Sequence, residues 1–197
     1  MEKHFIAALA ATVALGFSAP AVQADGHLTL AQILLADGDQ FDTNQDDFDI
    51  VTEAILATGL GGAADTMELT AFLPTDKAFR ILVEDAYGLS IKDEAALFQA
   101  IVDTLGGDTV RDVLYYHLVA GTVMSGDVVA AGDGAEISRL LGNSFTLDFK
   151  GKKIAQIRLT DNEPFLRDPI VRAVDITAEN GVAHVIDRVL PPVALLD

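Results

Sequence analysis

Hydrophobic residues recur at helical spacing through the first two thirds of the chain. Phe48, Val51 and Ile55, for example, share one face of a helix that Gly59 ends. A Gly-Gly pair at 106–107 separates two further helical patterns. The spacing predicts five helices: one at 30–35, one that Asp46 or Asp47 caps, a short one that Thr75 caps, one over 92–105 and one that Asp108 caps.

Beyond Leu118 the apolar period changes from helical spacing to two. Phe145, Leu147 and Phe149 alternate with polar residues, which is typical of a strand with one buried face. The other predicted strands are 68–73, 154–159, 170–176 and 182–190, bounded by Gly, Asn, Asp or Pro. Helices gathered in one half and antiparallel strands in the other predict an α+β fold, because a parallel sheet needs helices between its strands.

The start of the chain has the pattern of an export signal. A charged start leads into an apolar run over 5–17, and small residues before Ala24 indicate cleavage there. The run is shorter than the roughly 20 residues that a membrane-spanning helix needs, so we expect no membrane insertion. The predicted organisation is a signal peptide at 1–24, an acidic lead-in at 25–45 that tethers the domain, and one domain at 46–194. We expect a secreted or periplasmic monomer.

The charge and cysteine content of the chain argue against some classes of binding partner and active site. The chain has 13 Lys and Arg residues against 30 Asp and Glu residues, a formal net charge of −17. This charge opposes binding to nucleic acid or to an anionic membrane, because either surface would repel it. The chain has no cysteine, which excludes thiolate catalysis and zinc–thiolate sites.

Signatures of common catalytic sites do not occur in the sequence. It contains no Gly-x-Ser-x-Gly, no His-Glu-x-x-His and no glycine-rich phosphate loop. We therefore expect a protein without enzymatic activity and without a cofactor. An exported hydrolase is the alternative, and it would require at least two titratable groups with perturbed pKa values that meet in a cleft.

Three blocks of residues resemble the conserved segments of fasciclin (FAS1) domains. Residues 70–79, Thr-Ala-Phe-Leu-Pro-Thr-Asp-Lys-Ala-Phe, resemble the first signature box of that family. Residues 180–191, Asn-Gly-Val-Ala-His-Val-Ile-Asp-Arg-Val-Leu-Pro, resemble the second box. Residues 114–121, Leu-Tyr-Tyr-His-Leu-Val-Ala-Gly, are similar to the Tyr-His segment between the boxes. Three blocks in this order make the resemblance specific.

The resemblance implies a wedge of two β-sheets flanked by helices, in a non-enzymatic adhesion or binding protein. The boxes also have an architectural explanation, since Pro74 ends a strand and Phe72 and Phe79 pack on either side of the corner. Asn180-Gly181 predicts a tight hairpin turn between the last two strands. The residues assigned to the structural motif are Thr70, Phe72, Pro74, Thr75, Asp76, Phe79, Asn180, Gly181, His184, Asp187 and Pro191.

Candidate binding residues lie in the Tyr-His segment and in an enlarged loop at 161–169. In some animal relatives the Tyr-His segment is linked to integrin recognition, but the bacterial-style signal peptide gives no reason to expect integrins here. For His117 and His184 the first interpretation is a buried ring that donates to a backbone carbonyl, and the alternative is a ligand or metal role. The candidate binding residues are Tyr115, Tyr116, His117, Phe165 and Leu166.

An acidic stretch at 42–53 resembles a calcium loop of the EF-hand type. Asp42, Asn44, Asp46 and Glu53 stand at the first, third, fifth and twelfth positions, where such loops hold calcium. The sixth position should be Gly and is Asp47. The alternative is a capped helix preceded by a solvated acidic segment.

These observations support two functions. The first is adhesion or binding at the cell surface or matrix, with a surface polysaccharide, a matrix component or a cell-surface protein as partner. The second is a soluble carrier that holds a small apolar or carbohydrate ligand in a pocket walled by Tyr115, Tyr116 and Phe145.

Overall fold

The computed structural model describes residues 28–36, 41–142, 144–148, 157–161 and 166–192. Several predictions therefore concern residues outside the described ones, namely the signal peptide at 1–24, Phe149 and Phe165. The helices are α1 (Leu30–Leu35), α2 (Asp49–Thr58), α3 (Gly61–Thr66), α4 (Asp76–Tyr87), α5 (Glu94–Leu105), α6 (Gly107–Tyr116) and α7 (Ser125–Ala131). The strands are β1 (Leu69–Pro74), β2 (Leu118–Ala120), β3 (Ala135–Ser138), β4 (Ser144–Asp148), β5 (Arg158–Thr160), β6 (Val171–Ala178) and β7 (Gly181–Ile186).

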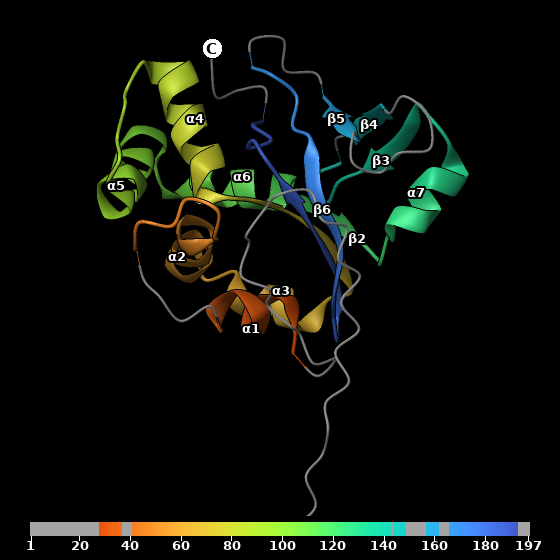
Figure 1. Ribbon diagram of the computed structural model, residues 1–197. Helices are drawn as coiled ribbons and strands as arrows, with labels where there is room; N and C mark the ends of the chain where they lie inside the picture. Colours follow the sequence, from red (N-terminus) through yellow and green to blue (C-terminus); the bar gives the residue numbers. More distant parts are fainter. Residues whose placement is uncertain (1–27, 37–40, 143, 149–156, 162–165, 193–197) are drawn as a thin grey trace, which may run out of the picture.

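Two sheets and their flanking helices form a layered wedge. Figure 1 shows α2, α4 and α5 on one side of a central sheet, and β3, β4, β5 and α7 on the other side. Helices α1 and α3 lie together at one end of the central sheet. The predicted α+β class, with a wedge of two sheets flanked by helices, is confirmed.

The central sheet has the strand order β2-β1-β7-β6. The predicted hairpin is confirmed, because β6 and β7 pair antiparallel. Strand β1 pairs in parallel with β7, from Leu69 opposite Gly181 to Pro74 opposite Ile186, and this pairing was not predicted. Spacing along the chain does not show it, because the crossover between these strands includes most of the domain.

The second sheet has the order β3-β4-β5, with antiparallel pairs. The alternation of Phe145 and Leu147 correctly predicted β4, and both side chains are buried. Helix α7 and strand β3 were missed, because they are only seven and four residues long, too short to show a clear apolar period. The strand predicted at 154–159 falls partly on residues that are not described, and β5 begins at Arg158.

The predicted caps of α2 are wrong. The helix begins at Asp49, its N-cap residue is Phe48, and no side chain of its own segment caps it. The carboxylate of Asp76, from α4, accepts a hydrogen bond from the backbone N–H of Ile50 at 3.0 Å instead. A neighbouring helix thus supplies the cap, which spacing within one helix cannot show.

The predicted caps of the next helices also differ from the structure. Thr75 occupies the N-cap position of α4, but its side chain makes no cap bond. The carbonyl of Thr75 accepts a hydrogen bond from the backbone N–H of Ala78 at 2.8 Å, so this N–H does not need the threonine hydroxyl as a cap. Helix α6 has Gly106 as its N-cap, so Asp108 lies inside the first turn and pairs with Arg111.

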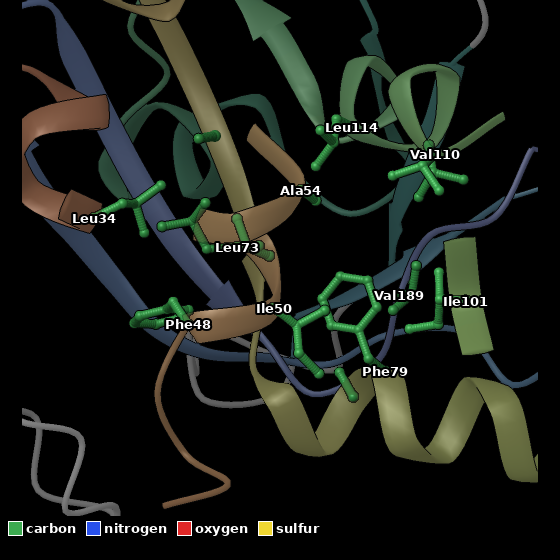
Figure 2. Packing of buried hydrophobic residues seen from close by; sticks show 14 of the residues in the cluster. Leu34, Phe48, Ile50, Ala54, Leu73, Phe79, Ile101, Val110, Leu114 and Val189 are labelled. Atoms are coloured by element: carbon green, nitrogen blue, oxygen red, sulfur yellow. The ribbon is translucent and has the colours of Figure 1, made fainter. Parts of the chain in front are cut away.

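Two apolar clusters lie on opposite faces of β1. Leu69, Ala71 and Leu73 point into the main cluster, which the helices cover. Phe72 points into the second cluster, where its ring meets that of Phe145 at 5.1 Å, edge to face. Figure 2 shows part of the main cluster, with residues of α2, α4 and α6 converging on β1. The predicted packing of Phe72 and Phe79 on either side of the corner follows this division.

Part of the predicted lead-in folds onto the domain. Leu30, Ile33 and Leu34 of α1 are buried, and Leu30 and Leu34 belong to the main cluster. The side chain of Asn180 accepts a hydrogen bond from the N–H of Leu30 at 2.9 Å. The helix predicted at 30–35 is confirmed, but it is part of the wedge and not of a tether that precedes the domain. None of the helices in the described ranges is long and apolar enough to span a membrane.

Candidate functional site

An apolar cavity lies beneath α1, against α2, α6 and one face of β1. Its volume is about 60 Å³. Figure 2 shows two of its lining residues, Leu34 of α1 and Leu73 of β1, facing each other. Only Tyr115 and His117 bring polar atoms to the lining. Such a cavity favours an apolar group over a sugar, because it offers few hydrogen-bond partners.

Three exposed apolar side chains lie on the segments that line this cavity. Met67 lines the cavity and is also 43% exposed, so the cavity reaches the surface beside it. Leu35 and Leu56, which are 48% and 49% exposed, directly follow the lining residues Leu34 and Ile55. We call Leu35, Leu56 and Met67 the apolar rim.

The Tyr-His segment contributes to the interior more than to the surface. Tyr116 is buried, and the guanidinium of Arg139 stacks over its ring at 3.7 Å. Tyr115 is half-buried and lines the cavity, so the two tyrosines point to opposite sides of α6. The sequence did not indicate Arg139, because its partners come from other elements. Of the three residues predicted to wall a pocket, Tyr115 does so, while Tyr116 and Phe145 belong to the second cluster.

The two histidines of the domain are both buried and both hydrogen-bonded. Nδ1 of His117 lies 2.7 Å from the carbonyl oxygen of Val113, and Nε2 accepts from the N–H of Leu190 at 2.9 Å. Because Nε2 accepts, the single proton of the neutral ring is on Nδ1. Burial, opposed by the bond to Val113, lowers the pKa of His117 to about 4.

His184 has the opposite tautomer. Its Nδ1 accepts from the N–H of Asp175 at 3.2 Å, and its Nε2 donates to the carbonyl of Val123 at 2.9 Å. The carboxylate of Asp175 accepts from the hydroxyl of Ser125 directly. The ring therefore does not contact the serine hydroxyl as a general base would, and these three residues lack the arrangement of a nucleophilic triad.

Most residues of the first box hold the scaffold together. The hydroxyl of Thr70 donates to the carbonyl of Gly121 at 2.7 Å and accepts from the N–H of Val123 at 2.8 Å. It thereby fixes the loop that leads from β2 to α7. Asp76 is fully buried and caps α2.

The second box is likewise architectural. Gly181 opens β7, and the two residues of the turn are Glu179 and Asn180 rather than Asn180 and Gly181. A Cβ on Gly181 would lie 1.8 Å from the carbonyl oxygen of Leu69, so close approach of β1 requires the glycine. Asp187 accepts from the N–H of Ile170 at 2.8 Å and pairs with Arg172, which closes the base of the hairpin, and Pro191 is buried beyond it.

The remaining candidate residues are Leu166 and the acidic residues of the predicted calcium loop. Leu166 is half-buried against the main cluster. Of the predicted calcium loop, Asp42 lies with Asp49 and Glu94, their carboxylate oxygens within 4.8 Å of one another. Glu53, on α2, belongs to neither of the acidic groups with this spacing in the described part of the chain. The calcium loop at 42–53 stays a prediction.

Known proteins share the sequence pattern and the fold of this chain. The sequence profile of the Fasciclin domain family matches residues 46–192. The Synechocystis protein sll1483 is 29% identical over 137 residues, which cover 66% of this chain and 62% of that protein. A solved FAS1 domain pair from the insect cell adhesion molecule Fasciclin I has a TM-score of 0.62 at 16% identity, covering 86% of this chain and 53% of the other. The chain thus spans less than two thirds of either relative, and the likeness to the insect structure shows the fold alone.

Proposed function

Because this chain belongs to the fasciclin family, we propose that it is an exported, non-enzymatic module that binds a protein at the cell surface or in the extracellular matrix. Fasciclin domains are generally adhesion or binding modules that occur in secreted or extracellular proteins, and the resemblance of the signature boxes is confirmed by the family match. The observation that carries the proposal is the apolar rim, three exposed apolar side chains on segments that line an apolar cavity.

The chemistry of the rim favours a protein partner over a polysaccharide. Leu35, Leu56 and Met67 are aliphatic or thioether side chains, which pack against apolar side chains of a partner and adapt to their shape. Sugars are held by aromatic rings and by convergent hydrogen-bond donors and acceptors, and the rim supplies neither. An apolar anchor of the partner would pack over Met67 and insert no more than a methyl-sized group, because the cavity has only about 60 Å³.

Charge substitution on the rim tests this proposal. Purified, fluorescently labelled protein is added to cells of the source organism that lack the gene, and saturable binding is measured. Leu56→Glu and Met67→Glu should reduce the affinity at least tenfold, because an apolar contact with the partner would have to bury a carboxylate. Leu89→Glu is the matched control, since Leu89 is 46% exposed and neither it nor its neighbours in the chain line the cavity, and it should bind like the unmodified protein.

Pretreatment of the cells identifies the class of partner. Protease digestion of the cell surface should abolish binding if the partner is a protein. If periodate oxidation of surface sugars abolishes binding and protease does not, the partner is a polysaccharide and the proposal is wrong on this point. Equal loss for the Leu56→Glu and Leu89→Glu variants would remove the rim from the binding surface.

A second candidate function follows from the cavity itself. A carrier for a small apolar molecule would hold it beneath α1, which would have to shift, because 60 Å³ is less space than a benzene-sized ligand occupies. Native mass spectrometry of protein purified from its own cells would reveal such a ligand as a reproducible added mass. Ala31→Leu fills the cavity from α1, so it should remove the added mass, whereas the charge variants on the rim should keep it.

A further inference from the structure

Three helices begin at the same place in the wedge, and each begins with an acidic residue. Asp49, Asp76 and Glu94 are the first residues of α2, α4 and α5, and all three are buried. Figure 1 shows these helices gathered on one side of the central sheet. Buried Asp47 and exposed Asp42 complete a set that we call the acidic junction: Asp42, Asp47, Asp49, Asp76 and Glu94.

Several carboxylate oxygens of the acidic junction are buried without a hydrogen-bond partner. Both oxygens of Glu94, whose residue is only 1% exposed, lack one. One oxygen of Asp76 and one of Asp47 have no partner except each other, and that bond forms only when one of the two carboxyls is protonated. None of the ion pairs in the described part of the chain involves these three residues. Buried polar atoms are almost always satisfied, so these oxygens point to a missing positive partner.

Charge at the acidic junction is only partly balanced by the protein. Each helix N-terminus contributes about half a positive charge, so three of them offset about 1.5 of the five negative charges. Arg80 lies close enough to Glu94 to favour its charged form, and its Nη2 donates to the carbonyl of Lys92 at 3.0 Å. About 2.5 negative charges remain with Arg80 counted as one positive charge, and one divalent cation would balance most of them.

The spacing of the oxygens fits a hard divalent cation of the size of calcium. Two sets of three residues have carboxylate oxygens within 4.8 Å of one another: Asp42, Asp49 and Glu94, and Asp47, Asp49 and Asp76. Calcium lies about 2.4 Å from its oxygen ligands, so two ligands on opposite sides of one ion are about 4.8 Å apart. The set contains only carboxylates, which excludes the thiolate and imidazole sites of zinc or copper.

We propose that the acidic junction binds one calcium ion, with Asp49 and Glu94 at its centre and Asp42 at its solvent side. The ion would connect the first turns of α2 and α5, which come from distant parts of the sequence. This site differs from the loop predicted from spacing, because it uses Glu94 of α5 instead of Glu53 of α2. It is also separate from the apolar cavity, whose lining contains none of its five residues.

Protons are the alternative occupants. Burial, and then the neighbouring carboxylates, raises the pKa of Glu94 to about 7, and burial raises the pKa of Asp76 in the same direction. Without a cation the acidic junction would therefore keep protons that calcium would displace. The two occupants are distinguished by calcium titration at a fixed pH.

Calorimetric titration with calcium chloride, and the melting temperature with calcium or with EDTA, test the proposal on the purified protein. Binding of one ion should raise the melting temperature by about 5 to 10 °C at a calcium concentration 100 times the Kd. Glu94→Gln should weaken calcium binding at least tenfold. At a pH above about 7, where Glu94 without calcium would be charged, it should also raise the melting temperature in EDTA, because it removes a buried negative charge. Asp42→Asn, at an exposed position, should weaken binding without changing the melting temperature in EDTA.

Two control variants make the result decisive. Glu53→Gln tests the loop predicted from spacing, and Asp112→Asn removes an exposed charge elsewhere on the helical side. Both should bind calcium like the unmodified protein. Absence of calcium binding at millimolar concentration would overturn the proposal in favour of protons. Binding that is lost in Glu53→Gln but kept in Glu94→Gln would overturn it in favour of the EF-hand loop.

Discussion

Replacement of Gly181 by alanine should be among the most destabilising single changes in this domain. The added Cβ would lie 1.8 Å from the carbonyl oxygen of Leu69 and 2.8 Å from its carbonyl carbon. Both atoms belong to the backbone of β1, so no side chain can rotate away. The backbone of Gly181 also has φ at +148°, which side-chain-bearing residues rarely adopt.

The size of the effect follows from what must move. The contact has to open from 1.8 Å to at least 3.0 Å, which pulls apart the start of the β1–β7 pair, including the bond from Leu69 N to Asn180 O. Backbone strain of this kind costs about 1–3 kcal/mol, and the lost strand pairing adds a similar amount. We therefore expect the free energy of unfolding to fall by about 4 kcal/mol, a large part of the 5–15 kcal/mol of a typical domain.

Urea unfolding followed by far-UV circular dichroism measures this difference directly. Gly126→Ala, in α7, is the matched control, since a Cβ there meets nothing within 4 Å. That control should keep the stability or raise it by up to about 1 kcal/mol. A loss below 1 kcal/mol for Gly181→Ala would show that the close approach of β1 is not what requires the glycine.

Two further predictions concern residues of the same boxes. In the folded protein the pKa of His117 is about 4, below its ordinary 6.5. The neutral buried ring therefore contributes about 3 kcal/mol to the free energy of unfolding above pH 6.5, and this contribution is lost as the pH falls toward 4. An NMR titration of the ring with a midpoint near 6.5 would contradict this. Asn180→Ala should leave the N–H of Leu30 and the carbonyl of Met67 without their partner, reduce the stability by about 2 kcal/mol and accelerate amide exchange in α1 more than in β7.

The sequence allowed the fold class to be predicted because its signals are local. Helical spacing, the change to period two after Leu118 and the Asn-Gly hairpin signal each depend on a few neighbouring residues. The parallel pair of β1 and β7 has no such local signal. The physical reason that residue 181 is a glycine also differs from the predicted one. The turn motif predicted a positive φ within the turn, whereas in the structure the backbone of β1 at Leu69 comes too close for a side chain.

The candidate sites were predicted less well, for the same physical reason. The interior position of His117 matched the first interpretation, because a histidine among apolar helix positions is commonly buried. The apolar rim was not indicated, since Leu35, Leu56 and Met67 stand on separate segments, and the packing of α1 against α2 and α3 has no signal in the sequence. The acidic stretch was noticed, but Asp76 and Glu94 were not associated with it, because helix starts that meet in space have no regular spacing in sequence.

Helix α2 connects the two proposed sites. Its first residue, Asp49, belongs to the acidic junction, Val51 and Ile55 line the cavity, and Leu56 stands on the rim. An ion that holds the first turn of α2 in place would therefore also hold one wall of the cavity. If the partner requires that wall to be ordered, calcium must tighten partner binding, and by thermodynamic reciprocity the partner must tighten calcium binding by the same factor.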